Sequence, residues 1–311
     1  MSKKDAETKQ FFQDTEHFAD AFNYFLFNGE NKINPNNLKE LDSTQVFKLN
    51  KEKRNAKAKE IRRDVFKQVS LMTDNKVAYL LLGIENQSIV DYTMPVRNML
   101  YDASRYDEQV QTTKKDNRKN KLLNKRNFVS GFTPKDKLIP IITLVVYWGA
   151  DEWIGPRDLH SMLDCEKKYL KYISNYKINL ICPYEMNEKD IEKFSSDMRD
   201  VMLYIKYQND SKKLSELCKA DKIKPVPNRT ATFVKEITNA KFEIKEGEEY
   251  VDMCKAEREW VEKEVEAGRK DERAKMMKGY LTLINENKIS FEDAATVLNM
   301  SVEEFKKESN I

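Results

Sequence analysis

Residues 62–88 contain two runs rich in apolar side chains, separated by a short polar break. Short apolar runs that are bounded by turn residues are typical of strands. The break holds Asp74 and Asn75, two residue types that favour a two-residue hairpin turn. The pattern therefore predicts an antiparallel hairpin.

The short turn also sets the register of the two strands. In this register Val65 faces Ile84, and Asp64 faces Glu85. The apolar side chains then share one face, which only Lys67 interrupts. They are Val65, Val69, Leu71, Ala78, Leu80, Leu82 and Ile84. A slip by one residue would mix the two faces, which is costly when one side is buried.

Helical spacing of apolar residues marks a segment on each side of the hairpin. Residues 15–27 predict a helix with an aromatic stripe. A second helix begins at about Pro95, because proline suits the first turn. We expect its core-facing side chains to be Val96, Met99, Leu100, Ala103 and Val110. Arg97, Tyr101 and Arg105 would lie on another face.

The rest of the first 240 residues predicts further strands and helices. The run 138–148 is rich in β-branched residues and predicts a fully buried strand. Residues 176–183 predict another short strand. Residues 155–163 open a helix, and Asn187–Tyr207 form a long amphipathic helix. Together these elements predict an α/β fold with a buried sheet.

The C-terminal part has a different pattern. Residues 243–279 are dense in Glu, Lys and Arg, which predicts an exposed helix or a helix that needs a partner. Ser290 with Asp293, and Ser301 with Glu304, match capping boxes that begin two short helices. These helices form either a helix-turn-helix-like tail or a hairpin that makes a homo-oligomer.

Composition narrows the class of protein. The 311 residues are 34% charged and 10% aromatic, and this aromatic content argues against disorder. The four cysteines form no CxxC pair, which excludes zinc-finger spacing. The N-terminus lacks the apolar core of a signal peptide, and the longest apolar run is too short to span a bilayer. We therefore expect a cytoplasmic protein without a membrane partner.

The facing acids are the strongest candidate for chemistry. Opposed Cβ atoms in such a hairpin lie about 4.5–5.5 Å apart, so Asp64 and Glu85 would repel unless a proton or a cation lay between them. Gln87 would point to the same side as Glu85. Carboxylate and amide oxygens suit Mg²⁺ or Mn²⁺ far better than zinc. The alternative is that both acids mark strand ends in solvent.

Six segments, in their order along the chain, carry a resemblance to a known family. They are "FADAFNYFLFNG", "LKELDSTQV", "RRDVFKQV", "YLLLGIENQS", "DYTMPVRNMLYDASRY" and "LIPIITLVVYWG". They closely resemble the Rpn family of recombination-promoting nucleases and putative transposases, within the PD-(D/E)XK nuclease superfamily. The resemblance implies a nuclease-like core over residues 1–240, with a central mixed sheet flanked by helices. Residues 241–311 would be a helical C-terminal extension, a charged helix plus a small helical hairpin tail.

The resemblance also implies roles for individual residues. Asp64 would be the metal-binding aspartate and Glu85 the second metal ligand for Mg²⁺ or Mn²⁺. The backbone carbonyl of Asn86 would be a further ligand, and Asp20 is an additional acidic candidate. Gln87 would be catalytic in the place usually held by lysine. It departs from that pattern, because a carboxamide can orient a water or phosphate only by hydrogen bonds.

Two basic stretches flank the predicted site and favour double-stranded DNA as the partner. They are residues 48–63 and 114–126, and lysine and arginine on loops bind phosphates without reading sequence. The expected DNA contacts are Arg62, Arg63, Arg97, Tyr101, Arg105, Lys114, Lys115, Arg118 and Lys119. Taken singly, each stretch could instead be a solvated loop.

These features predict a metal-dependent DNA endonuclease that hydrolyses phosphodiester bonds and is linked to recombination or mobile elements. The alternative is a DNA-binding or oligomerising protein with a degenerate, inactive nuclease core. His17 and His160 lie on separate predicted segments, which argues against a two-histidine metal site. The chain also lacks a Walker-type phosphate-binding loop, so nucleotide hydrolysis has no support.

Overall fold

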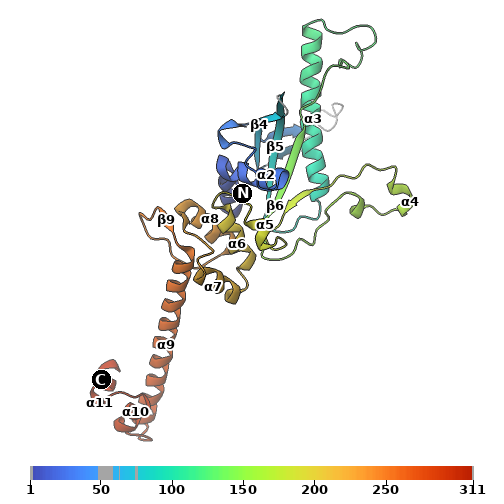
Figure 1. Ribbon diagram of the computed structural model, residues 1–311. Helices are drawn as coiled ribbons and strands as arrows, with labels where there is room; N and C mark the ends of the chain where they lie inside the picture. Colours follow the sequence, from blue (N-terminus) through green and yellow to red (C-terminus); the bar gives the residue numbers. More distant parts are fainter. Residues whose placement is uncertain (1–2, 48–58, 63, 74–75, 310–311) are drawn as a thin grey trace. The chain divides into compact units, whose positions relative to one another are not determined.

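The computed structural model describes residues 3–47, 59–62, 64–73 and 76–309 (Figure 1). The chain divides into two compact units. The first unit is Met1–Ala240 together with Glu246–Asp252, and the second is Lys241–Lys245 together with Met253–Ile311. Within the described ranges, no helix combines the length and the apolar character needed to cross a membrane.

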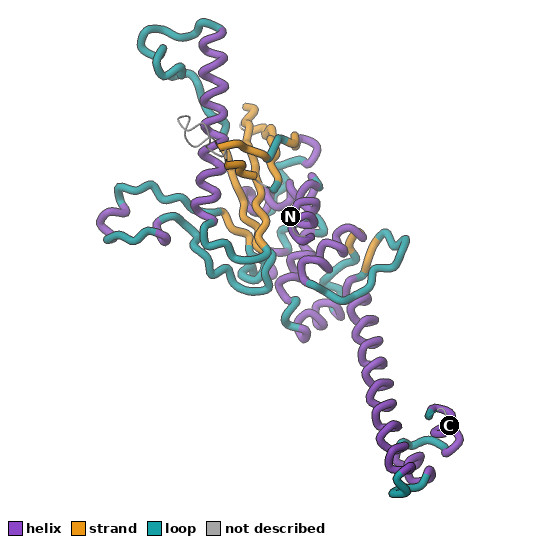
Figure 2. The backbone as a smooth tube through the Cα atoms, turned by 180° about the vertical axis from the view of Figure 1, so that it is seen from behind, coloured by secondary structure: helices purple, strands orange, loops and turns teal. Residues whose placement is uncertain are grey.

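A five-stranded mixed sheet forms the centre of the first unit, which confirms the predicted fold class (Figure 2). Its strands, in spatial order, are β1 (Leu38–Glu40), β4 (Val65–Thr73), β5 (Lys76–Gln87), β6 (Ile141–Tyr147) and β7 (Asn179–Ile181). β1, β4 and β5 pair antiparallel, whereas β5, β6 and β7 pair parallel. Two small ribbons pair β2 (Thr44–Phe47) with β3 (Lys59–Arg62), and β8 (Val226–Pro227) with β9 (Tyr250–Val251).

The hairpin has the predicted register. Val65 pairs with Ile84, and the pairing continues without a break to Thr73 and Lys76. The turn residues between them lie outside the described ranges. Lys67 interrupts the apolar face as expected, and it is only 2% exposed. Its ammonium donates to the carbonyl of Gln13 at 2.7 Å and lies 4.9 Å from the ring centre of Phe18, so the buried charge is satisfied.

Helices cover both faces of the sheet. Lys67 reaches α1 (Lys3–Gln13) and α2 (Thr15–Phe27) on one face, whereas its neighbour Phe66 packs with Tyr106 of α3 on the other. The remaining helices are α3 (Met94–Lys119), α4 (Lys167–Leu170), α5 (Glu188–Ile191), α6 (Met198–Tyr207), α7 (Ser211–Lys219) and α8 (Asn228–Thr238) in the first unit. Two short 3₁₀ turns are η1 (Pro35–Asn37) and η2 (His160–Met162).

The prediction of which side chains of α3 face the core is wrong. Ala103 is exposed, whereas Asn98, Tyr101 and Asp102 are buried. The helix turns this polar face to the sheet because the sheet offers polar partners there. Thr143 of β6, for example, donates to Asp102 at 2.7 Å.

Two helices are also shorter in the structure than the sequence predicts. The expected helix over Asn187–Tyr207 is interrupted between α5 and α6, where the amides of Ser195 and Ser196 donate to Asp20 instead of continuing a helical ladder. Residues 155–163 contain only η2. They belong to an arm that is closed by a bridge between Asp158 and Lys177.

The second unit consists of α9 (Met253–Asn285), α10 (Phe291–Val297) and α11 (Val302–Glu308). Ion pairs one turn apart, such as Lys270 with Glu266, support the polar surface of α9. Both predicted capping boxes are present, at Ser290 and Ser301. A small core joins the end of α9 to the two short helices. It contains Met277, Ala294, Ala295 and Phe305.

Candidate active site

Asp64 lies directly before β4, beside the end of β5. The backbone amide of Asn86 donates to Asp64 Oδ2 at 2.7 Å, which holds the carboxylate against the neighbouring strand. Burial raises the pKa of Asp64, although this hydrogen bond and the positive charge of Arg97 act in the opposite direction. The carboxylate is therefore held in an environment where a cation would be favourable.

Glu85 is buried in the adjacent strand, with 1% of its surface exposed. Its Oε2 lies 3.4 Å from Nη2 of Arg97. Burial raises the pKa of Tyr101 on α3, and the negative charges of Glu85 and Asp64 raise it further. Glu85 thus contacts Arg97 of α3, and the charges of Asp64 and Glu85 both act on Tyr101 of the same helix.

Arg97 is the positive charge near Asp64 and Glu85. Its guanidinium donates to Asp91 and, at 3.2 Å, to the hydroxyl of Tyr101. Asp91 in turn accepts from the backbone amide of Thr93 at 2.7 Å and from its hydroxyl at 2.6 Å. Burial would raise the pKa of Asp91, but these hydrogen bonds outweigh it and hold the pKa below its usual value. Arg97 is thus anchored from the loop before α3.

A cavity of about 850 Å³ opens beside these residues. Its lining includes Asp64, Asn86, Gln87, Ser88 and Arg97, together with Lys3, Lys4, Asp5, Thr8, Ile89 and Glu236. Trp148 fixes the end of β5, because its indole donates to Asn86 Oδ1 at 2.9 Å and its backbone amide donates to the carbonyl of Gln87 at 2.8 Å. The strand therefore presents Gln87 to the same cavity as Asp64.

Asp20 lies apart from Asp64 and Glu85. It is 2% exposed and accepts hydrogen bonds from the amides and hydroxyls of Ser195 and Ser196, at 2.6–3.1 Å. It lines a different cavity, together with Asn23 and Asn31. The local geometry thus gives Asp20 a role in fixing the α5–α6 connection.

The carboxylate and carboxamide oxygens at the site suit a hard cation, but there are few of them. No group of three or more His, Cys, Asp or Glu side chains capable of holding a metal occurs within the described part of the chain. The candidate oxygens come from Asp64 and the carboxamide of Gln87, which line one cavity, and from Glu85, whose carboxylate lies 3.4 Å from Arg97. Two carboxylates are the number that Mg²⁺ usually takes from a protein, with water and substrate oxygens completing its shell.

The predicted DNA contacts fall into separate groups. Arg97 and Tyr101 are part of the site, and Arg105 lies over the ring of Phe66 and pairs with Glu108. Lys114, Lys115, Arg118 and Lys119 lie at the other end of α3. Arg62 ends β3, and Arg63 lies outside the described residues.

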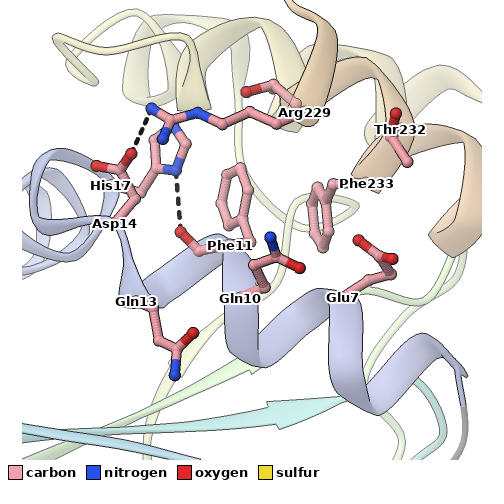
Figure 3. Close-up of a pocket in the computed structure, with 10 residues that line it drawn as sticks. Glu7, Gln10, Phe11, Gln13, Asp14, His17, Arg229, Thr232 and Phe233 are labelled. Atoms are coloured by element: carbon pink, nitrogen blue, oxygen red, sulfur yellow. Dashed lines mark hydrogen bonds and ion pairs between the residues drawn. The ribbon is translucent and has the colours of Figure 1, made fainter.

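The sequence analysis missed a second constellation, around His17 (Figure 3). Its Nδ1 lies 3.0 Å from the carbonyl of Phe11, and its Nε2 lies 2.5 Å from Asp197. The rings of His17 and Phe233 stack on the two sides of Phe11, beside a cavity of about 420 Å³. Asp197 is 180 residues away in the sequence, so no local pattern could have indicated the pair.

Comparison with known proteins gives one match. The family model described as "Putative transposase, YhgA-like" matches residues 2–224. No curated protein and no solved structure matches the chain. The matched range contains Asp64, Glu85, Gln87 and Arg97, and it ends before Glu236 of the cavity lining.

Proposed function

The chain belongs to the family of putative YhgA-like transposases, and we propose that it is a metal-dependent DNA endonuclease that acts in recombination. One observation carries the proposal. The carboxylates of Asp64, directly before β4, and Glu85, on the paired strand β5, both lie near Arg97, and Asp64 and Arg97 line one cavity. Paired acids beside a cation suit the hydrolysis of a phosphodiester.

Asp64 and Glu85 would hold Mg²⁺ or Mn²⁺, with the backbone carbonyl of Asn86 as a further ligand. When bound, the ion would lower the pKa of a coordinated water and offset negative charge that develops on the phosphorus centre. The amide of Asn86 keeps the Asp64 carboxylate in a fixed orientation. This fixed orientation reduces the reorganisation needed during the reaction.

Gln87 and Arg97 would act on the water and the phosphate. The carboxamide of Gln87 lines the cavity and can accept a hydrogen bond from an attacking water or donate one to a phosphate oxygen. The guanidinium of Arg97 suits a phosphate because it offers several donors in one plane. Asp91 and Tyr101 restrict its position. Arg97 thereby supplies a positive charge that a glutamine cannot.

Nicking of a supercoiled plasmid tests the proposal. We expect Mg²⁺- or Mn²⁺-dependent nicking by the wild type, and a loss of at least about 100-fold in Asp64→Asn and Glu85→Gln. Asp107→Asn is a matched control, because Asp107 is an exposed acid of α3 that accepts from Gln111. Calorimetric titration with Mn²⁺ should show binding to the control variant and much weaker binding to the two site variants.

The second candidate is a DNA-binding protein whose nuclease core is inactive. This alternative is favoured by glutamine in place of lysine. It is also favoured by the absence, among the described residues, of three His, Cys, Asp or Glu side chains grouped to hold a metal. It predicts retained binding of duplex DNA without nicking under either metal. Such a result, with well-folded wild-type protein, would replace the endonuclease proposal.

A further inference from the structure

Helix α3 and the chain that follows it form an extension beyond the sheet (Figures 1 and 2). After Lys119 the chain turns and runs back to β6 as residues 120–139, here called the return loop. The base of the loop is pinned to α3 by Gln109. Its carboxamide donates to the carbonyl of Ile139 at 3.2 Å and accepts from the Ile139 amide at 2.7 Å.

The outer part of the return loop is also fixed. Asn117 is 4% exposed, and its amide donates to the carbonyl of Gly131 at 3.1 Å and to Asp136 at 2.8 Å. Gly131 has a φ of +68°, and a Cβ there would lie 2.9 Å from Cγ of Lys114. The loop therefore packs tightly on the helix, so side chains that it exposes are held in place.

The fixed loop nevertheless presents large apolar side chains to solvent. Phe128 is 65% exposed, Val129 is 90% exposed and Leu122 is 61% exposed. A turn around Asn124 and Asn127 holds the segment that carries them, with the amide of Gly131 donating to the carbonyl of Asn127 at 2.8 Å. A cluster of exposed apolar residues on an ordered loop marks a binding surface.

Charge around the cluster indicates what binds there. Residues 114–137 contain nine Lys or Arg and two Asp. One of these acids, Asp136, is engaged by Asn117 and by the amide of Thr133 at 2.6 Å. The segment that carries the exposed apolar side chains thus has an excess of positive charge, which complements a polyanion rather than an ordinary protein surface.

The distance from the candidate site favours duplex DNA. Lys115 follows Arg97 by 18 residues, which is five full helical turns, so both residues project from one side of α3. At about 1.5 Å per residue, they are roughly 27 Å apart along the axis, and Lys119 is roughly 33 Å from Arg97. One turn of B-DNA is about 34 Å. A duplex along α3 would therefore present equivalent backbone positions to both ends of the helix.

We propose that the return loop is a DNA wedge. Phe128 and Val129 insert into the minor groove about one turn from the scissile phosphate, and Lys115, Arg118 and Lys119 hold the flanking backbone. Apolar side chains that enter between base steps unstack them and kink the duplex by about 20–90°. The wedge rests on the proposed function, because the same duplex must reach Asp64 and Glu85.

The test uses the full chain in EDTA, with duplexes of about 30 base pairs that carry fluorophores at both ends. 2-Aminopurine is moved through successive TA steps, which unstack easily. We expect the wild type to shorten the end-to-end distance and to raise 2-aminopurine emission at one step. The double variant Phe128→Ala/Val129→Ala should lose both signals, whereas Phe128→Leu should keep them. Ile154→Ala is the matched control, because Ile154 is 68% exposed and lies outside the loop.

The outcomes separate the wedge from the nuclease. Unchanged bending by the double variant, or duplex binding without any 2-aminopurine response, overturns the wedge while nicking remains intact. Failure of the wild type to bind any duplex overturns the proposed function as well. Binding to vesicles that contain phosphatidylserine, without DNA bending, would assign the loop to a membrane surface instead. Thermal melting should show that all variants are folded, because the substituted side chains are exposed.

Discussion

Both ring nitrogens of His17 face acceptors, which determines its protonation. The carbonyl of Phe11 can only accept, so Nδ1 must carry a hydrogen, and Nε2 points to the carboxylate of Asp197. Burial alone would lower the pKa of His17, but the hydrogen bond and charge of Asp197 outweigh it and raise the pKa. The same pairing outweighs burial at Asp197 and lowers its pKa. Both shifts favour the charged forms of His17 and Asp197 over the neutral ones.

The His17–Asp197 pair predicts a pH dependence of stability. Since the folded pKa of His17 is raised, its contribution is fully present below about pH 6.5 and is lost as the pH rises through the higher folded pKa. We expect His17→Gln to lower the free energy of unfolding by about 3 kcal/mol at pH 6, and by less at alkaline pH. Calorimetry between pH 6 and 9 measures this. His160→Gln is the control, and equal pH profiles for wild type and His17→Gln would contradict the assignment.

Single residues were predictable where a local pattern constrained them. The two apolar runs on either side of Asp74 and Asn75 predicted the strand pairing, in which Val65 lies opposite Ile84. Asp20 and Asp197 were not predictable in this way, because their partners lie far away in the sequence. The anchoring of Arg97 by Asp91 was also missed, although "DYTMPVR" places the two residues within one loop and helix start.

At the scale of elements, the return loop depends on one backbone conformation. Gly131 has a positive φ, and a Cβ added there would lie 2.9 Å from Cγ of Lys114. Gly131→Ala adds a Cβ that is strained by about 1–2 kcal/mol and also meets Lys114. We expect faster hydrogen exchange over residues 120–139 and a lower melting temperature.

Gly247→Ala is a matched control for Gly131→Ala. Gly247 also has a positive φ, but a Cβ there meets nothing within 4 Å. Both variants carry conformational strain, so a difference between them reports the contact with Lys114. Equal exchange rates over the return loop in the two variants would show that the loop does not need this close packing.

Elements with regular apolar spacing were predicted well, and elements shaped by polar contacts were not. The buried strand β6 and the helix α2 follow their patterns. The orientation of α3 does not, because Arg97 and Asp102 have partners on the sheet that outweigh the apolar stripe. The predicted helix over 187–207 is interrupted because Asp20 captures the Ser195 and Ser196 amides.

At the scale of the whole molecule, β9 decides where the first unit ends. Tyr250–Val251 pair with Val226–Pro227, so residues Glu246–Asp252 belong with the sheet-containing unit although α9 follows immediately. Charge patterning indicated a change near residue 240, but a two-residue strand has no sequence signal of its own. A test of the units should therefore cut the chain after Asp252.

A chain that ends at Asp252 should retain the candidate site. We expect its nicking rate to stay within about twofold of wild type, because every residue of the site lies in the first unit.

We also expect the native mass of this shortened chain to fall to that of a monomer. Val261 and Val265 lie one turn apart on charged α9 and are about half exposed, which favours association through this helix. Light scattering measures the mass, and an unchanged oligomeric state would exclude α9.

The attachment of the return loop has a consequence for how proteins with this fold diversify. Gln109 clamps the point where the excursion rejoins the sheet, close to where it left. The residues between Gln109 and Ile139 can therefore be replaced as a block, because the connection from β5 through α3 to β6 is still held by Gln109. Grafting the corresponding segment from a relative should therefore change the exposed surface of the loop and leave the surroundings of Asp64 and Glu85 in the recipient unchanged.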